Sequence, residues 1–265
     1  MQTTTLTDLF DVPAVPKGRA VTIGAFDGVH LGHQALLRLV RDLARARELT
    51  ATLLTFDRHP AEVVRPEVAP KVLTTLEQKL ELLAALDAVD ECMVLPFDEA
   101  RSRESAEEFV DDILASLLRT RLVVVGADFH FGNRRHGDVP LLQRMGAEIG
   151  FEVLGLGLVA APDGSIAASG ALPYSSTRVR TLLARGDVEG AAAILGRPHE
   201  VRGELERADG DVALVLSSRI CLPAPGIYRT DGGTAMVVDD EGSPTRRVWL
   251  DGDPREAVRF FARAD

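Results

Sequence analysis

Two histidines, His30 and His33, stand three positions apart in a stretch that also holds Gly24, Gly28 and Gly32. Glycines let a backbone approach an oxyanion closely and adopt dihedral angles that are closed to other residues. A helical pattern starts directly afterwards, and a helix N-terminus points unsatisfied N–H groups at an anion. Imidazoles placed there can donate hydrogen bonds to a phosphate oxygen in a transition state. The stretch therefore predicts phosphate chemistry; the alternative is a tight turn with two exposed histidines.

The segments around this stretch alternate between strand-like and helix-like patterns. We expect strands at residues 20–26, 51–56, 91–97, 122–129 and 151–159, and helices at residues 33–49, from about 74, from about 105 and at 138–149. Capping boxes at Thr74 with Glu77 and at Ser105 with Glu108 predict where two of the helices begin. Alternation at this spacing predicts an α/β fold with a doubly wound parallel sheet, covered by helices on both faces.

Three polar segments follow three of the expected strands, at residues 24–33, 55–60 and 126–138. The carboxyl ends of parallel strands open at one edge of a sheet, and ligands bind outside that edge. We therefore expect these three loops to converge on a single site.

The pattern changes after residue 170. Two short helices broken at Gly186 are followed by alternating, turn-rich segments between residues 201 and 250, and we expect a short helix at residues 254–264. These features predict a small antiparallel β unit after the parallel sheet. We place the domain boundary near Arg197, which gives domains of residues 1–196 and 197–265.

Composition narrows the class of protein. The chain has 265 residues and a net charge of −10, which argues against nucleic-acid binding because a phosphate backbone needs a basic face. It has no run of 18 apolar residues and no basic N-terminal region followed by an apolar one, so we expect neither membrane insertion nor secretion. Cys92 and Cys221 lie in apolar contexts typical of buried free thiols in a reducing cytoplasm. The six histidines are scattered and do not predict a zinc site.

The stretch "GAFDGVHLGHQALL" resembles the nucleotidyltransferase signature of the histidine–x–glycine–histidine superfamily. It is most similar to the adenylyltransferase module of bacterial bifunctional riboflavin kinase/FAD synthetases, and "TFDRHP", "VVVGADFHFGNRRHGD", "SSTRVR" and "GDVEGAAAILGRP" fit that family in the same order. The resemblance covers residues 21 to about 203. It implies a Rossmann-like nucleotidyltransferase fold, and transfer of AMP from ATP to FMN with release of pyrophosphate. It also implies Mg²⁺ bound with the ATP, and FAD as product.

The resemblance also implies roles for individual residues. The expected catalytic residues are His30, His33 and Arg180. The expected nucleotide-binding residues are Gly24, Phe26, Asp27, Gly28, Gly32, Asn133, Ser175, Ser176, Thr177 and Arg178. The expected flavin-binding residues are Phe56, Asp57, His59, Pro60, Asp128, Phe129, Phe131 and Arg135. For Phe129 and Phe131 the alternative is packing in the core. Arg58 replaces the proline that the family has in "TFDRHP".

The family's second module is a riboflavin kinase with a P-T-A-N element and a catalytic glutamate. The corresponding stretch here keeps only a later P-x-x-G-I-Y turn, and Arg247 stands where the glutamate is expected. An arginine cannot act as a base. We therefore predict that riboflavin phosphorylation is absent. The sequence leaves open whether this remnant is a scaffold, a lid or an oligomer contact.

Two other functions stay open from the sequence. One is a related adenylyl- or cytidylyltransferase with a different phosphorylated acceptor, and Tyr174 beside "SST" leaves the base preference open too. The other is a non-catalytic flavin- or nucleotide-binding regulator. The expected partners are the small molecules ATP and FMN, with neither nucleic acid nor membrane, and a homo-oligomer is left open.

Overall fold

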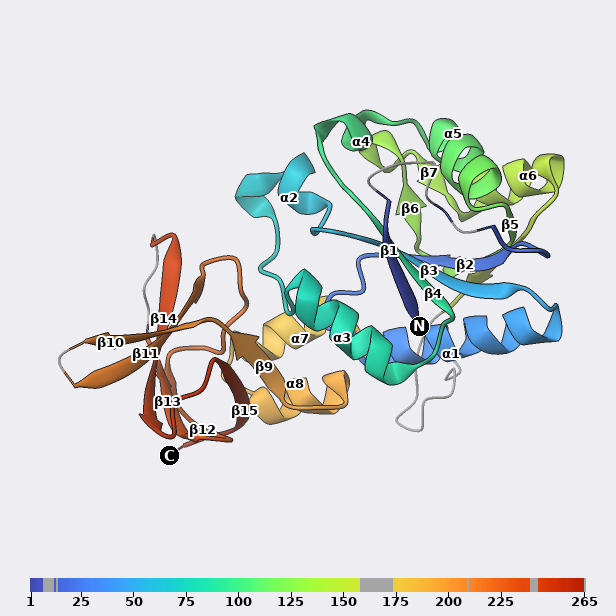
Figure 1. Cartoon of the computed structure of the whole chain (residues 1–265). Helices are drawn as coiled ribbons and strands as arrows, with labels where there is room; N and C mark the ends of the chain where they lie inside the picture. Colours follow the sequence, from blue (N-terminus) through green and yellow to red (C-terminus); the bar gives the residue numbers. More distant parts are fainter. Residues whose placement is uncertain (7–11, 13, 158–173, 209, 239–242, 265) are drawn as a thin grey trace. The chain divides into compact units, whose positions relative to one another are not determined.

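The structure is a computed structural model that describes residues 1–6, 12, 14–157, 174–208, 210–238 and 243–264. It divides into two compact units (Figure 1). The first unit comprises Met1–Phe26, Gly32–Ala69 and Leu80–Pro173. The second unit comprises Asp27–Leu31, Pro70–Lys79 and Tyr174–Asp265. These units are a division by compactness, and the domain boundary near Arg197 stays a prediction.

The first unit is built on a six-stranded parallel sheet with the order β1-β4-β3-β2-β5-β8. Its strands are β1 (Gln2–Thr5), β2 (Arg19–Ile23), β3 (Thr50–Phe56), β4 (Glu91–Leu95), β5 (Thr120–Gly126) and β8 (Glu152–Leu156). All five predicted strands are confirmed, except that residues 158–159 of the last one lie outside the described residues. Edge strand β1 was not predicted. Between β2 and β5 the chain reverses its direction of travel across the sheet, and such a switch point is where ligands bind.

Helices cover both faces of this sheet, as predicted, with α1 on one face and α5 and α6 on the other in Figure 1. The helical segments are α1 (Leu31–Ala46), α2 (Ala61–Val64), η1 (Pro66–Val68), α3 (Leu76–Leu86), α4 (Glu99–Arg103), α5 (Ala106–Glu108), the π-helical η2 (Phe109–Leu117), η3 (Asn133–Arg135) and α6 (Val139–Ile149). A two-stranded ribbon of β6 (His130–Phe131) and β7 (Gly137–Asp138) lies between β5 and α6 in the chain. Within the described residues, no helix is both long and apolar enough to cross a membrane.

One predicted helix start is confirmed and another is wrong by one residue. The box of Ser105 and Glu108 is present at α5. At α3 the reciprocal hydrogen bonds join Thr75 and Gln78 (3.0 and 3.2 Å), in place of the predicted Thr74 and Glu77. The hydroxyl of Thr74 is used elsewhere, which is why its neighbour caps the helix.

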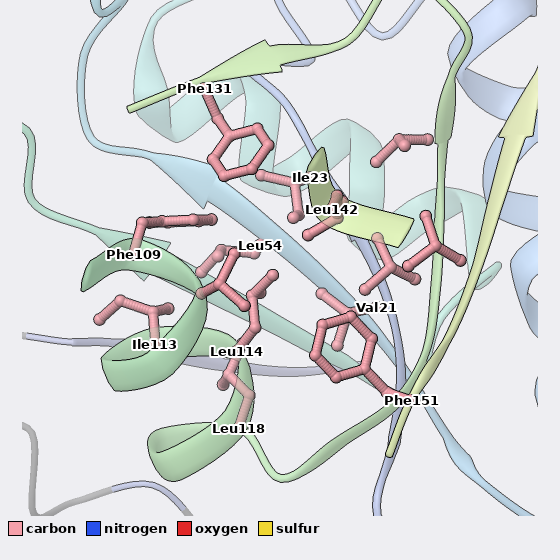
Figure 2. Packing of buried hydrophobic residues seen from close by; sticks show 14 of the residues in the cluster. Val21, Ile23, Leu54, Phe109, Ile113, Leu114, Leu118, Phe131, Leu142 and Phe151 are labelled. Carbon is pink, nitrogen blue, oxygen red and sulfur yellow. The ribbon is translucent and has the colours of Figure 1, made fainter. Parts of the chain in front are cut away.

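Apolar side chains from the sheet and from η2 form the core of the first unit, shown in Figure 2. The figure labels Val21, Ile23, Leu54, Phe109, Ile113, Leu114, Leu118, Phe131, Leu142 and Phe151. Near the start of β2 the guanidinium of Arg19, which is 1% exposed, forms an ion pair of 2.8 Å with Glu91. A buried charge is tolerated only when it is paired and hydrogen-bonded, and here Arg19 also donates to the carbonyl of Leu118.

The second unit contains a seven-stranded sheet with the order β10-β11-β14-β13-β12-β15-β9, antiparallel throughout. Its strands are β9 (His199–Arg202), β10 (Glu204–Ala208), β11 (Asp211–Ser217), β12 (Gly226–Thr230), β13 (Gly233–Val237), β14 (Thr245–Gly252) and β15 (Ala257–Arg263). Helices α7 (Ser176–Leu183) and α8 (Val188–Leu195) precede them, separated at Gly186 (φ +76°) as predicted. The antiparallel β unit is therefore confirmed, and both cysteines are buried free thiols.

The helix predicted at residues 254–264 is wrong, because this segment forms strand β15. Val258, Phe260 and Ala262 are buried, whereas the residues between them are exposed. That is the period-two pattern of a strand with one covered face. β15 pairs with β9 and with β12, so its backbone hydrogen bonds are made within the sheet.

Candidate active site

The loop that leaves β2, residues 24–33, is called the phosphate loop below. In the first unit, Gly24 donates its N–H to the carbonyl of Leu54 (3.1 Å). A Cβ at Gly24 would lie 3.1 Å from the ring of Phe26, so a side chain there would be crowded. Phe26 is buried with φ +50°, and its ring centroid lies 4.7 Å from that of the half-buried His33 in α1. The predicted Gly32 lies in the first turn of the same helix.

In the second unit, the carboxylate of Asp27 holds three neighbours together. It is 8% exposed and accepts hydrogen bonds from the backbone N–H groups of Leu73 (2.9 Å) and Thr74 (3.1 Å). It also forms a 2.5 Å ion pair with Nη2 of Arg180. Asp27 therefore fastens the phosphate loop to two other segments of the chain.

Gly28 occupies a position that only glycine fits. Its φ is +80°, and a Cβ would lie 2.8 Å from the side chain of Leu73. Its N–H donates to Oγ1 of Thr74 (3.1 Å), and its carbonyl accepts from Nη2 of Arg197 (2.8 Å). Sequence reasoning missed Thr74 and Arg197 as parts of this site, although Arg197 belongs to the quoted stretch "GDVEGAAAILGRP".

His30 is 5% exposed, and its environment favours the neutral imidazole. Its pKa is lowered from the ordinary 6.5 to about 4, mainly by burial and to a smaller extent by the charges of Arg197 and Arg180, against an opposing backbone hydrogen bond. His30 is therefore neutral at pH 7. A neutral imidazole has one N–H donor and one acceptor nitrogen.

The "SSTRVR" segment begins α7, within the second unit. Oγ of Ser175 caps the helix by accepting from the N–H of Arg178 (3.2 Å). Oγ of Ser176 donates to the carbonyl of Asp27 (2.8 Å), and Nε of Arg180 donates to the carbonyl of Lys71 (2.6 Å). The neighbouring Thr177 is exposed. The structure thus brings the start of α7 together with Asp27 across about 150 residues of sequence.

The "TFDRHP" loop follows β3 in the first unit. Asp57 accepts from the N–H of Phe97 (2.8 Å) and from Arg58 (3.2 Å), the residue that replaces the family's proline. The ring of Phe56 meets that of Phe97 edge to face at 5.4 Å. Nδ1 of His59 accepts from a backbone N–H at 3.2 Å, at the point where Pro60 leads into α2. Asp57 and Phe56 thus attach the loop after β3 to the segment after β4.

The loop after β5 contains two aromatic candidates with different surroundings. Phe131 is 8% exposed and belongs to the core, where its ring stacks on that of Phe129 at 5.4 Å and meets that of Phe109 at 5.7 Å. Phe129 is half-buried and packs against the same cluster. This packing favours the core alternative for Phe131, and contact of either ring with a flavin stays a prediction.

The polar candidates of this loop also differ from one another. Nδ2 of Asn133 donates to the carbonyl of Ser102 (2.9 Å), so this side chain ties the loop to α4. Asp128 and Arg135 are exposed, and Arg135 has φ +60°. Their side chains are therefore accessible at the end of β5.

The loops predicted to converge follow strands that end at one edge of the parallel sheet, and their convergence on a single site stays a prediction. Strands β3, β2 and β5 are neighbours and run parallel, so the segments that follow them leave from the same edge. In the part of the chain that the structure describes, no group of three or more histidine, cysteine, aspartate or glutamate side chains is arranged to hold a metal ion.

Comparisons with known proteins agree with this fold. The family model described as FAD synthetase matches residues 12–169. The bifunctional riboflavin kinase/FMN adenylyltransferase of Escherichia coli (strain K12) is 35% identical over 225 residues, which cover 82% of this chain and 69% of the relative. The Pseudomonas fluorescens protein of the same name is 37% identical over 219 residues, covering 80% and 67%. The one from Buchnera aphidicola (subsp. Schizaphis graminum) is 31% identical over 197 residues, covering 74% and 61%.

Among solved structures, a crystal structure described as a macrolide-efflux protein from Streptococcus pneumoniae matches with a TM-score of 0.78. It is 24% identical, and the match covers all of this chain and 91% of that one. At this identity the likeness shows a shared fold alone.

The parallel sheet, with a glycine- and histidine-bearing loop at its switch point, defines a Rossmann-like fold of the nucleotidyltransferase type. Within that class, the match over residues 12–169 and the identities of 31–37% show that this chain belongs to the FAD synthetase family. The chain spans between 61% and 69% of the length of the three relatives named above.

Proposed function

We propose that this chain is an FMN adenylyltransferase, which transfers AMP from ATP to FMN and releases pyrophosphate. The supporting observation is the junction in the second unit, where Asp27 of the phosphate loop is bonded to both Ser176 and Arg180 of α7. Two segments that resemble the family's phosphate-binding motifs are thereby held next to each other. The names of the relatives support FMN as the acceptor.

The proposed reaction needs positioning and charge stabilisation more than acid–base chemistry. An oxygen of the FMN phosphate attacks the α-phosphorus of ATP in line, a new P–O bond forms, and the bond to the leaving pyrophosphate breaks. A phosphate monoester is already a nucleophile at neutral pH, so the step requires no general base. Rate enhancement then comes from alignment and from donors aimed at the developing charge. We assign those donors to His30, His33 and the N–H groups of the phosphate loop.

Arg180 can hold the loop and contact phosphate at the same time. Its bonds to Asp27 and Lys71 use Nη2 and Nε. A guanidinium has five N–H donors, so donors remain for the departing pyrophosphate. Mg²⁺ enters with ATP as part of the substrate, held mainly by the phosphate oxygens.

The proposal includes the absence of riboflavin kinase activity. Arg247, at the position where the family has its catalytic glutamate, lies on β14 and forms an ion pair of 3.2 Å with Glu206. A guanidinium stays protonated and accepts no proton from a substrate hydroxyl. We place the proposed AMP transfer in the cytoplasm, where the small molecules ATP and FMN would be the substrates.

The test is chromatographic detection of FAD after the purified chain is mixed with FMN, ATP and Mg²⁺. A parallel reaction contains riboflavin in place of FMN. We expect FAD in the first reaction and no FMN in the second. Formation of FMN from riboflavin would overturn the kinase part of the proposal. Failure to form FAD, with adenylylation or cytidylylation of another phosphoester, would overturn the assigned acceptor or nucleotide.

A further inference from the structure

Arg197 is a half-buried cation that bonds to the phosphate loop. Its guanidinium donates to the carbonyls of Gly28 (2.8 Å) and Leu195 (3.3 Å). Burial lowers its pKa, and the charge of Glu200 opposes that shift. Among the described residues, Glu200 pairs directly with Arg202 and Arg259. A charged group removed from water costs free energy unless hydrogen bonds compensate. Here the compensation comes from backbone carbonyls, one of which belongs to the phosphate loop.

The bond from Arg197 reaches the loop one residue before a strained position. Gly28 has φ +80°, and Val29, which is 2% exposed, has φ +41°. A β-branched residue at positive φ is a genuine outlier that persists only when the surrounding structure holds it in place. The N–H of Gly28 bonds to Thr74 and its carbonyl bonds to Arg197. Both sides of Gly28 are therefore fixed immediately before the strained residue that leads to His30.

The segment that follows β11 supports the phosphate loop a second time, through residues 70–74. Val72 donates its N–H to the carbonyl of Arg219 and accepts from the N–H of Cys221, both at 2.8 Å. The next two residues, Leu73 and Thr74, bind Asp27. The stretch that replaces the family's P-T-A-N element thus supports the segment that holds the phosphate loop.

We propose that Arg197 is a positioning residue of the phosphate loop, whose guanidinium holds the Gly28 carbonyl so that the strained backbone presents His30 to the triphosphate. This inference rests on the proposed function, because it takes ATP as the ligand. It assigns to the residues at the start of the second sheet a part in AMP transfer, in place of a kinase reaction of their own. The charge of Arg197 also helps to keep His30 neutral.

Two substitutions of Arg197 and one matched control test the proposal. Arg197→Met removes the donors and the charge but keeps a similar stem, and Arg197→Lys keeps the charge with a different donor geometry. Arg259→Met is the control, because Arg259 is an exposed arginine of β15 in the second unit, and its side chain pairs with Glu200. Circular dichroism and thermal melting establish that each variant is folded.

Three readouts separate positioning from a general loss of structure. They are the affinity for ATP with Mg²⁺ by calorimetry, kcat and KM for ATP, and hydrogen exchange of the amides of Asp27–Leu31. A small misplacement of a catalytic loop can cost on the order of 10²-fold. We expect Arg197→Met to lower kcat/KM by roughly that factor, to weaken ATP binding and to speed exchange in the loop. Arg197→Lys should fall between Arg197→Met and the unaltered chain, and the control should match the unaltered chain.

A folded Arg197→Met variant with unchanged ATP affinity and unchanged exchange would overturn the proposal. If that variant does not fold, Arg197→Lys decides: unchanged binding and exchange would contradict the assigned role, and a selective loss would support it. ATP binding and exchange need no FMN. If the chain binds ATP but makes no FAD, the proposed function is wrong. The role of Arg197 can still be tested in that case by ATP binding and hydrogen exchange.

Discussion

The two sheets of this chain use their strand ends differently. In the parallel sheet, β3, β2 and β5 each end in a polar loop at the same edge. In the antiparallel sheet, β12 and β13 are joined by the tight turn of Asp231 and Gly232. Parallel strands need long crossover connections, whereas antiparallel strands can be joined by short hairpins. The parallel sheet therefore carries long polar loops that can bind a ligand at its edge, whereas the short turn between β12 and β13 offers few side chains for binding.

The phosphate loop qualifies this contrast. It leaves β2 of the parallel sheet, yet Asp27–Leu31 belongs to the compact unit that contains the antiparallel sheet. The loop's fastenings, Thr74, Arg180 and Arg197, lie in that unit too. The comparison teaches that residues packed with one sheet can fix the backbone of a loop that leaves the other.

The largest expected effect concerns the parallel sheet's edge. His33→Ala should lower the rate of FAD formation by roughly 10²-fold or more, because removing one donor to a developing oxyanion costs about that much. Arg38→Ala, an exposed change on the same helix, serves as the control. Chromatographic initial rates measure both. Full turnover in His33→Ala would show that the imidazole does not act on the phosphates.

Acidification should destabilise the second unit. Burial, the largest cause, lowers the pKa of both His30 and His199 to about 4. Below pH 6.5 the unfolded chain binds protons that the folded chain does not. The contribution of these histidines to the free energy of unfolding is therefore fully present above pH 6.5 and declines as the pH falls towards about 4. The loss reaches about 3 kcal/mol for each histidine. Urea titrations between pH 4 and 7 measure it, and His199→Gln should flatten part of the slope. An identical slope in that variant would contradict the role of His199.

Asp27→Asn should have a smaller effect on both stability and activity. The amide keeps an oxygen that can accept from the N–H groups of Leu73 and Thr74, but it leaves the partly buried Arg180 without its counter-charge. We expect a loss of about 2 kcal/mol in unfolding free energy, together with weaker ATP binding. Asp57→Asn, in the neighbouring β3 loop, is the comparison, because its partner Arg58 is largely exposed. Equal destabilisation by the two changes would show that the ion pair of Asp27 contributes no more than the more exposed ion pair of Asp57.

The smallest effect is expected in the antiparallel sheet. Arg247→Glu should change the stability by less than about 1 kcal/mol, since exposed ion pairs such as that with Glu206 contribute little. It should leave FAD formation unchanged and should not create riboflavin kinase activity, because the P-T-A-N element is also missing. Radiolabelled ATP with riboflavin provides a sensitive assay. Labelled FMN from this variant would show that the antiparallel sheet can support riboflavin phosphorylation, which our proposal excludes.

Much of the fold could be predicted because it follows local rules. The strand–helix alternation, the cap at Ser105 and the break at Gly186 all depend on neighbouring residues. The helix predicted at residues 254–264 failed because helix-forming residues at its start obscured the alternation of Val258 and Phe260. At the Thr74–Thr75 doublet either hydroxyl could cap α3, and a tertiary contact with Gly28 decides which one does.

The motifs of the candidate site could be predicted from the sequence, but the long-range hydrogen bonds that hold them in place could not. Glycines and histidines at a strand end are visible in the sequence, but Arg197 meets Gly28 across 169 residues. Such a contact depends on how the chain folds back on itself, which no local pattern encodes. The burial that keeps His30 neutral has the same origin.

The second unit is assembled from three separated stretches of the chain, Asp27–Leu31, Pro70–Lys79 and Tyr174–Asp265. A gene shortened to end before the last stretch would still encode every residue of the glycine- and histidine-bearing motif. Its product would nevertheless lose the side chains that Asp27 and Gly28 bond to from far along the chain. The last stretch is therefore needed to hold the phosphate loop, whatever reaction its own sheet performs.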